Sequence, residues 1–564
     1  MNLPRVPYRL QKNKSEVIAM RGINYSDMLR DGDLRESENL SARRYPYLSV
    51  RRGRETDDSH PEAFSMTEWD GKLIVVESVV NEANKDVAHI WFGDDTIKDE
   101  NGEPYELTPT AKQFAVVSNK LFIVPDNVYV DLSKDEETGE VNPTIKEIVL
   151  SKSWQGLGFT SDNKIHAVKK TGDPAGTKLS SYYKPGDFVA VSNVYKINGS
   201  GDAEPVSEND GVTFIVDTVD DESGTIIAKG IPFTPYSGIS ATGVGSMLFT
   251  LSVKFPELDY ICENNNRLYG CSNKEQTIYV SSLGDPTQLY FFEGDSNSFA
   301  VAVGSDGKFT GCTRLGSSVL FWKEDKLHKL LGEYASEYTL YSYDIDGVQE
   351  GSHKSQQVIG EVLYYLGTQG VYAYTGGLPE LISDNFGQRR YKNGVAGHDA
   401  DSYYLSVDDE QGKSHLFVYE THAGLWLRED GTRVKDFARA GRELYMLDNG
   451  GMIHKLDSGK EDAGVEWMAQ FTPFYETMQG RKVYSKLLIR AEIPAGAYIK
   501  PEVRFDGGDW KSLGAVTGGK DAKNDTVSIP IPISRCDKFE LRLRGKGAVT
   551  VLGMVREFMV RSDK

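Results

Sequence analysis

The chain has 564 residues and a formal net charge of −19 at pH 7, and it is 39% hydrophobic and 26% charged. A chain of this length is long enough for more than one domain, each with its own core. The acidic balance argues against a surface built to wrap DNA, and no apolar run approaches the roughly 18 residues of a membrane-spanning helix. The 30 Tyr and 56 Gly residues favour an all-β protein, because Tyr suits strands and Gly suits turns.

Residues 1–56 are expected to form an extended N-terminal arm whose charge is opposite to that of the remainder. They contain 12 Lys and Arg and 7 Asp and Glu, a net of +5, so residues 57–564 carry −24. A basic arm on an acidic body suits docking onto an acidic neighbour, and solvated charges on a loose segment are an equally good interpretation. Five arginines lie close together in this arm: Arg43, Arg44, Arg51, Arg52 and Arg54.

Two interpretations of these arginines are open. Interleaved with Tyr45 and Tyr47, they could contact DNA phosphates, since guanidinium and aromatic groups suit that role. The segment could instead lie against the body of the protein or a neighbouring subunit, with the arginines paired to carboxylates. We favour the interface interpretation.

From Phe64 onward, short strands alternate with polar turns. Residues 260–294 show the unit, in which β-branched and aromatic runs are broken by clusters of Gly, Asn, Asp and Pro, as is typical of antiparallel hairpins. Similar units recur every 30–45 residues or so, about the spacing of propeller blades. About seven units are present, which predicts a β-propeller, and a series of β-sandwiches is the alternative.

Two further modules are expected. A Pro-Gly-Asp-Phe-Val segment at 185–189, followed by a hairpin, predicts a small β-barrel inserted within or between blades. Near the C-terminus, strict alternation places Phe539, Leu541 and Leu543 on one face of a strand, which favours a β-sandwich. The predicted domains are the N-terminal arm (1–56), the first propeller blades (57–145), the inserted β-barrel (146–256), the remaining blades (257–462) and the C-terminal β-sandwich (463–564).

Several short motifs follow one another in an order that resembles a known family. They are Gly22-Ile23-Asn24, Asp31-Gly32-Asp33, the arginine-rich segment 43–54, Asn266-Arg267-Leu268, Val280-Ser281-Ser282, Gly284-Asp285-Pro286, Leu320-Phe321-Trp322 and Gly370-Val371-Tyr372. The order is similar to that of tail nozzle or packaged-DNA stabilisation proteins of tailed bacteriophages, also called tail tubular protein B. The resemblance spans most of residues 21–560 and leaves 146–256 uncovered.

The resemblance implies a structural virion protein and not an enzyme. Such a protein forms a homo-oligomeric ring, usually of six copies, below the portal and adaptor of the phage neck. It continues the channel, and packaged DNA passes through the lumen without sequence-specific binding. Assembly in the host bacterial cytoplasm follows, and no membrane or cofactor is implied.

The sequence contains no catalytic motif, and no residue is assigned to catalysis, cofactor binding or metal binding. Close-set acids such as Asp220-Asp221 and Asp399-Ala400-Asp401 are expected in turns. Cys262, Cys271, Cys312 and Cys536 are interpreted as small buried hydrophobes, although Cys262 and Cys271 could face each other across a hairpin.

Two other functions stay open. A carbohydrate-binding or carbohydrate-hydrolysing propeller would need a pocket lined by carboxylates and Trp. The seven Trp residues are far apart in the sequence, which disfavours that alternative. A general interaction scaffold is the other, because fold alone does not fix function.

Overall fold

The structure is a computed structural model that describes residues 12–57, 60–135, 139–148, 151–159, 163–168, 178–230, 232–237, 240–290, 292, 294, 296–457, 464–478, 480–519 and 525–561. Over these residues the chain is all-β, as predicted, without an α-helix and with three single 3₁₀ turns. These turns are η1 (Leu179–Ser181), η2 (His353–Ser355) and η3 (Asp384–Phe386). Residues 1–11 of the expected arm and the expected boundary at 462 lie outside the described residues.

The chain forms two compact units. The first combines Met1–Ser78 with Val348–Lys564, and the second is Val79–Gly347. The division falls within a run of four strands in chain order: β6 (Ala63–Trp69), β7 (Lys72–Val80), β8 (Asp86–Phe92) and β9 (Asp95–Thr96).

The first unit contains three four-stranded antiparallel sheets. One is β30 (Gln357–Ile359), β31 (Val362–Leu366), β32 (Val371–Tyr374) and β33 (Glu380–Leu381). The next is β34 (Tyr391–His398), β35 (Ser402–Asp409), β36 (Ser414–Glu420) and β37 (Leu425–Asp430). The third is β38 (Val434–Ala440), β39 (Glu443–Asp448), β40 (Ile453–Lys455) and β5 (Glu55–Asp57).

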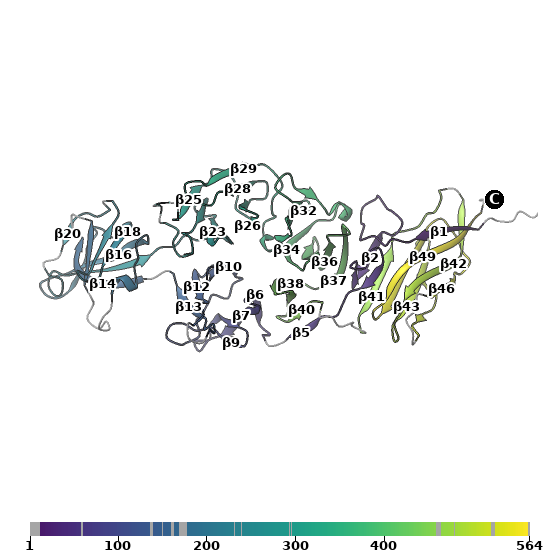
Figure 1. Ribbon diagram of the computed structural model, residues 1–564, viewed down its shortest axis with the longest axis horizontal. Helices are drawn as coiled ribbons and strands as arrows, with labels where there is room; N and C mark the ends of the chain where they lie inside the picture. The colour runs from purple at the N-terminus through teal and green to yellow at the C-terminus, as the bar shows by residue number, and fades with distance from the viewer. Residues whose placement is uncertain are drawn as a thin grey trace, which may run out of the picture. The chain divides into compact units, whose positions relative to one another are not determined.

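The last of these sheets joins distant parts of the chain. Its fourth strand, β5, comes from the N-terminal arm and pairs with β40, as Figure 1 shows by the purple β5 beside the green β40. The first strands of successive sheets pack against one another, β30 on β34, β34 on β38 and β38 on β6. The arm therefore supplies the outer strand that completes this sheet.

Two larger antiparallel sheets complete the first unit. One contains β1 (Asn13–Val17), β3 (Leu40–Ser41), β4 (Leu48–Val50), β42 (Arg481–Glu492), β46 (Asp525–Pro530), β47 (Arg535–Cys536) and β49 (Thr550–Arg561). The other contains β2 (Leu34–Glu38), β41 (Glu466–Phe471), β43 (Tyr498–Phe505), β44 (Lys511–Ser512), β45 (Val516–Thr517) and β48 (Phe539–Lys546).

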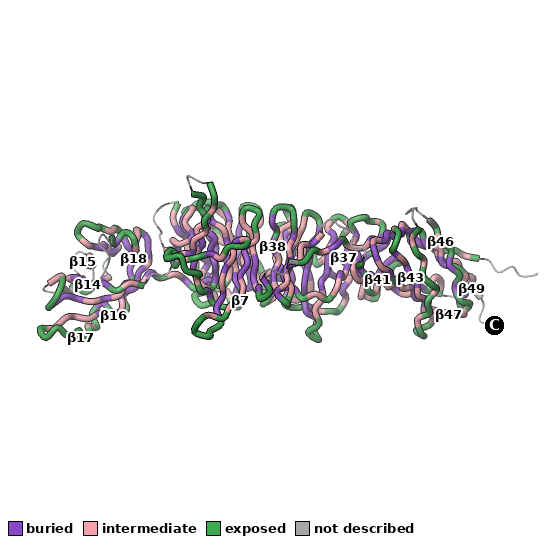
Figure 2. Tube along the Cα trace, turned by 90° about the horizontal axis from the view of Figure 1, so that it is seen from below, coloured by how far each residue is buried: buried purple, intermediate pink, exposed green. Residues whose placement is uncertain are grey.

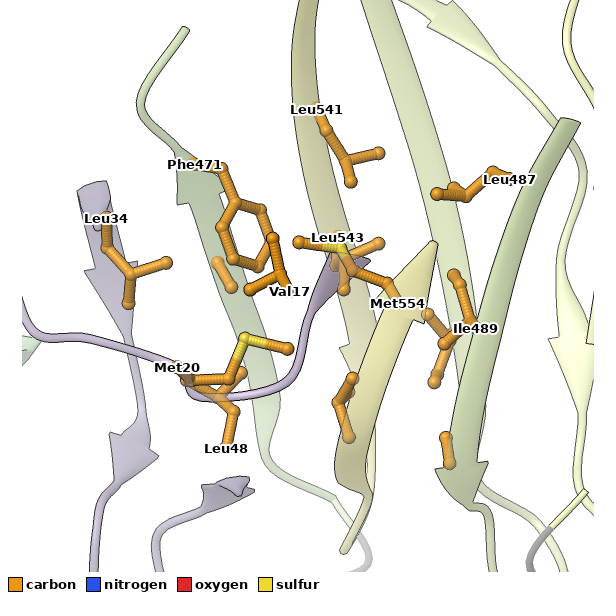
Figure 3. Close-up of a cluster of buried hydrophobic side chains, with 14 of the residues drawn as sticks. Val17, Met20, Leu34, Leu48, Phe471, Leu487, Ile489, Leu541, Leu543 and Met554 are labelled. Carbon is orange, nitrogen blue, oxygen red and sulfur yellow. The ribbon is translucent and has the colours of Figure 1, made fainter. Parts of the chain in front are cut away.

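These two sheets share one hydrophobic core, and the N-terminal arm is part of it. Val17, Met20, Leu34 and Leu48 pack with side chains from the last hundred residues (Figure 3). Phe539, Leu541 and Leu543 are all fully buried there, which confirms the face predicted from their alternation. Every strand in the described part of the arm is thus paired: β1 with β49, β2 with β41, β3 with β4, β4 also with β49, and β5 with β40.

The second unit also contains three four-stranded antiparallel sheets, and β10, β22 and β26 pack in succession. The first sheet is β10 (Gln113–Val117), β11 (Lys120–Val124), β12 (Val128–Asp131) and β13 (Thr144–Glu147). The second is β22 (Tyr260–Asn264), β23 (Arg267–Ser272), β24 (Thr277–Val280) and β25 (Phe299–Ala302). The third is β26 (Gly311–Leu315), β27 (Ser318–Trp322), β28 (Leu327–Leu331) and β29 (Thr339–Tyr343).

Between β13 and β22 the chain forms an eight-stranded antiparallel sheet. Its strands are β14 (Ser151–Phe159), β15 (Lys164–Val168), β16 (Phe188–Ile197), β17 (Ala203–Pro205), β18 (Thr213–Asp220), β19 (Thr225–Ala228), β20 (Tyr236–Ser237) and β21 (Met247–Val253). Six of them pair in a closed circuit, β14-β15-β19-β18-β16-β21 and back to β14. The circuit has its own core, which includes Trp154, Phe159 and Phe249.

The turns repeat one hydrogen-bond pattern. In five of them an Asp or Asn side-chain oxygen accepts backbone N–H groups two and four residues later, and the residue three positions on has a positive φ. The five first residues are Asn81, Asp99, Asn198, Asp409 and Asp448.

The close-set acids follow the same logic. Asp220 accepts the backbone N–H groups of Glu222 and Ser223, and Asp399 accepts those of Asp401 and Ser402. Both were correctly expected in turns.

Burial follows the strands. In Figure 2 buried residues, in purple, lie along the strands, and exposed residues, in green, gather at the turns between them. Within the part of the chain described above, no helix is long and apolar enough to span a bilayer.

Candidate functional site: an arginine cluster in the first unit

The five predicted arginines lie on and after a hairpin. β3 and β4 pair Leu40 with Val50, and the turn between them is closed by Tyr45 N–H donating to Ala42 O at 2.8 Å. Arg43 and Arg44 therefore project from the turn. Arg51, Arg52 and Arg54 follow β4 on the path to β5.

Arg43 and Arg52 share one carboxylate. The Arg43 guanidinium donates to both Asp457 and Asp399, and its Nη2 also donates to the Tyr404 hydroxyl at 3.2 Å. Arg52 Nη1 donates to Asp457 Oδ1 at 3.2 Å. Burial lowers the pKa of Arg43, but Tyr404, Asp399 and Asp457 outweigh it and raise the pKa above its ordinary value.

The Arg54 side chain is more enclosed than those of Arg43, Arg44 and Arg52. Its Nη1 donates to Asp430 Oδ2 at 2.7 Å and its Nη2 to Glu429 Oε2 at 2.5 Å. The side chains of Arg54 and Glu429 are only 13% and 8% exposed. Burial lowers the pKa of Arg54, but the two carboxylates outweigh it and raise the pKa above its ordinary value. At Asp430 burial raises the pKa, but Arg54 and the hydrogen bonds from Thr432 together outweigh it and lower the pKa.

The other two arginines bind polar groups of the same unit. Arg44 Nη1 donates to Glu492 Oε2 at 2.8 Å and to Thr550 Oγ1 at 2.7 Å. Arg51 Nε donates to Asn39 Oδ1 at 2.7 Å. Arg43, Arg44, Arg52 and Arg54 are thus paired with carboxylates of this chain, from β37, β42 and the turns after β34 and β40.

All five arginines line one pocket of about 400 Å³. Glu420 also lines it, and burial raises the pKa of that carboxyl despite the hydrogen bond from Ser402 Oγ. A carboxyl with a raised pKa could donate a proton. However, Glu429, Asp457 and Glu492 in the same pocket are each engaged by an arginine, so the arrangement is suited to holding segments together.

Within this chain, the arginines therefore lie against the body of the protein and pair with its carboxylates, as the second of the two interpretations expects. Contact with a neighbouring subunit or with DNA stays a prediction. The partners Asp399, Glu429, Asp430, Asp457 and Glu492 were not identified from the sequence. They lie more than 350 positions from the arginines they bind, and no local signal marks them.

The first family-like motif is an anchor between the arm and β37. Ile23 N–H donates to Trp426 O at 2.7 Å, and Asn24 Nδ2 donates to Asp33 Oδ2 at 2.7 Å. A Cβ at Gly22 would lie 2.4 Å from Trp426 O, and Gly32 has φ +95°. Steric or hydrogen-bonding requirements thus explain why these residues occupy these positions.

A second family-like motif, in the second unit, encloses a buried arginine. Arg267 is 1% exposed, and its Nη1 donates to Ser281 O and Asn297 O, both at 2.8 Å. Ser281 Oγ accepts Leu268 N–H at 2.9 Å. The Asn-Arg-Leu strand and the serine that follows β24 are therefore parts of one hydrogen-bonded turn.

The Gly284-Asp285-Pro286 turn fastens the eight-stranded sheet to the rest of the second unit. Lys184 Nζ donates to Asp285 Oδ2 at 2.7 Å and to Thr287 Oγ1 at 2.8 Å. The rings of Phe188 and Tyr290 lie 4.6 Å apart beside it. Burial raises the pKa of Asp285, but Lys184, Thr287 and Lys120 outweigh it and lower the pKa to about 2.

The two remaining motifs belong to cores. Leu320, Phe321 and Trp322 in β27 are fully buried, and Val371 and Tyr372 in β32 are buried as well. Among the described residues, no group of His, Cys, Asp or Glu is placed to hold a metal ion. Two further pockets in the first unit, one around Tyr25 and Arg389 and one around Asp401 and His422, have no Trp in their walls.

Comparison with known proteins adds no family. No family model matches the chain, and no curated protein sequence matches it.

Two solved structures show a distant likeness to this chain. PorZ, a surface component of the type-IX secretion system of Porphyromonas gingivalis, is 11% identical, with 92% of this chain and 81% of PorZ covered and a TM-score of 0.27. An exo-β-1,3-galactanase from Phanerochaete chrysosporium is 11% identical, with 85% and 100% covered and a TM-score of 0.20. Likenesses this low assign no function.

Proposed function

We propose that the seven four-stranded sheets are the blades of a β-propeller. In support, neighbouring strands within each sheet follow one another in the sequence. The exception is the sheet β38-β39-β40, whose fourth strand is β5 from the N-terminal arm. Shared outer strands of this kind remove free edges when a ring of blades closes. On the same proposal, the closed circuit within β14–β21 is a small inserted barrel, and the two larger sheets are a β-sandwich.

We further propose that the chain is a structural virion protein of a tailed phage. It would form a ring below the portal and adaptor that continues the DNA channel and helps to retain or conduct packaged DNA. The observation that carries this proposal is the ordered set of family-like motifs, whose residues form buried or hydrogen-bonded anchors. Gly22-Ile23-Asn24 joins the arm to β37, Arg267 holds the turn after β24, and Asp285 binds Lys184 of the inserted segment.

The charges are compatible with that role. Arginines that would otherwise attract DNA phosphates are largely paired with carboxylates of the same chain, and the chain keeps a net charge of −19. A net negative surface repels the DNA backbone, so a duplex would slide past it without adhering.

The test is the mass and shape of the purified protein, measured by light scattering and negative-stain imaging, alone and with a portal–adaptor complex. A ring, or a monomer that becomes a ring on the portal, is the expected result. A protein that stays monomeric, does not bind the portal–adaptor complex and binds or hydrolyses glycans would overturn the proposal and favour the carbohydrate-active alternative.

A further inference from the structure

Two cysteines of the second unit meet between neighbouring sheets. Cys262 lies on β22 and Cys312 on β26, and their sulfur atoms are 3.0 Å apart. The sequence suggested a different pair, Cys262 with Cys271. The register corrects this, because Cys262 lies opposite Tyr269 and Cys271 opposite Tyr260.

The two strands are also held together beside the sulfur atoms. β22 and β26 pack directly, and the next residue on β22, Glu263, receives a bond of 2.9 Å from Arg314 on β26. Both cysteines are half-buried against the core that contains Tyr269 and Phe321. The two thiols are therefore presented to each other by a packed and ion-paired contact between sheets.

The other two cysteines have different surroundings. Cys271 directs its thiol at Tyr260 O at 3.9 Å and Cys536 at Lys482 O at 3.8 Å, and both side chains are fully buried. They fit the interpretation of cysteine as a small hydrophobe.

We propose that Cys262 and Cys312 are a modification site, at which a small disulfide oxidant such as oxidised glutathione forms an intramolecular disulfide between the sheets β22–β25 and β26–β29. This inference does not depend on the proposed function. The thiolate of Cys262 attacks one sulfur of the oxidant, forming a mixed disulfide and releasing one glutathione thiolate. Cys312 then attacks the Cys262 sulfur and expels the second glutathione.

The reaction balances in atoms and electrons. Two protein thiols and one oxidised glutathione give one protein disulfide and two glutathione thiols, which take up the two protons and the two electrons of the protein thiols. Burial and the neighbouring Cys262 sulfur raise the pKa of Cys312. Because the thiolate is the attacking species, the rate of disulfide formation rises with pH.

The bond would constrain unfolding. It links positions 50 residues apart, and a cross-link removes conformations from the unfolded chain. The oxidised protein is therefore expected to unfold at a higher temperature than the reduced protein.

The experiment exposes the full-length native protein to oxidised glutathione, then denatures and alkylates it and maps its peptides by mass spectrometry. The chain has four free cysteines, so four alkylated thiols are expected before oxidation and two afterwards, with a peptide that joins Cys262 to Cys312. C262A and C312A should lose this peptide and the rise in unfolding temperature. C536A, a buried cysteine outside the pair, should keep both.

Three results would overturn the proposal. They are four alkylated thiols after oxidation, a glutathione adduct on either cysteine that does not resolve, and a disulfide between other partners or between two chains. If C262A and C312A are too unstable to compare, the wild-type peptide map decides alone, since it needs no substitution.

Discussion

Arg52 and Arg54 lie two positions apart and carry the same charge in different surroundings. The Arg52 side chain is 59% exposed, whereas Arg54 is 13% exposed and donates to Glu429 and Asp430. Breaking a buried ion pair from one side leaves unpaired carboxylates and costs about 3–5 kcal/mol. An exposed pair contributes only about 0.2–1 kcal/mol.

We therefore expect R54M to lower the free energy of unfolding by several times more than R52M, in urea titrations at neutral pH. R54K should fall between them, because an ammonium group cannot donate to both carboxylates in the planar geometry of a guanidinium. Equal effects of R54M and R52M would show that the buried pair does not stabilise the first unit.

Gly22 offers a steric test at the same scale. A Cβ there would lie 2.4 Å from Trp426 O and 2.8 Å from Trp426 N, and backbone atoms cannot move aside as a flexible side chain does. We expect G22A to destabilise the protein by about 1–3 kcal/mol, the range for overpacking. At Gly377 no atom lies within 4 Å of the added Cβ, so G377A should change stability by less than about 0.5 kcal/mol. Thermal unfolding of the two variants compares them, and matching midpoints would refute the steric argument.

At the residue scale, the sequence marked positions but not their partners. The sequence marks Gly22, Asn24 and Asp33 as parts of motifs. It does not show that Gly22 lies against Trp426, because the two residues are 404 positions apart in the chain. The arginine cluster was likewise found without its carboxylates. Ion pairs of this kind depend on which strands become neighbours, and strand order is a property of the whole fold.

Among the elements, the turn that holds Asp285 makes stability depend on pH. The pKa of Asp285 is lowered to about 2 in the folded protein, from an ordinary value of 3.8. A carboxyl with a lowered folded pKa contributes stability that is present above its unfolded pKa and is lost as the pH falls through the folded pKa. The shift corresponds to about 2 kcal/mol of folding stability, which the protein gains as the pH rises from about 2 to about 4.

D285N should therefore be less stable than the wild type at neutral pH by about that amount. The difference in free energy of unfolding should shrink as urea titrations are repeated from pH 6 down to the lowest pH at which both remain folded. D202N is the charge-matched control, since Asp202 is exposed. A D285N difference that stays constant below pH 4 would contradict the role of the Lys184 pair.

The neighbouring Asp187 does not obscure this window. Burial raises its pKa to about 6, against the opposing effect of Lys184. Its stabilising contribution is complete below its ordinary pKa of 3.8 and is lost as the pH rises through about 6. That loss occurs above the window in which Asp285 titrates.

The elements themselves were the most predictable part of the molecule. Turns beginning with Asp or Asn and bearing Gly three positions later, as at Asp409 and Asp448, carry their hydrogen bonds in the local sequence. Alternation correctly placed Phe539, Leu541 and Leu543. Cross-sheet neighbours were not predictable, as the cysteines show: hairpin proximity suggested Cys271, and packing of β22 on β26 selects Cys312.

At the scale of the whole chain, the two ends of the sequence fold together. β1 and β4 pair with β49, β2 pairs with β41, and Val17, Met20, Leu34 and Leu48 contribute to the core of the last hundred residues. The sequence predicted a separate arm and a separate C-terminal module, because composition reports segments and cannot report which distant strands pair. These pairings predict that the C-terminal module depends on the arm.

A fragment of residues 464–564 alone should therefore lack a cooperative unfolding transition and should bind a hydrophobic dye, because the core side chains that the arm supplies and its strands in both sheets are missing. Adding residues 12–52 as a separately expressed chain should restore the transition, since these residues supply β1 to β4 and leave out β5, which belongs to another sheet. The same segment with Leu34 and Leu48 replaced by Asp, whose side chains would be buried without partners, is the control that should fail. If 464–564 unfolds cooperatively by itself, its core is complete without the arm. Removing the arm would then lower the free energy of unfolding only slightly.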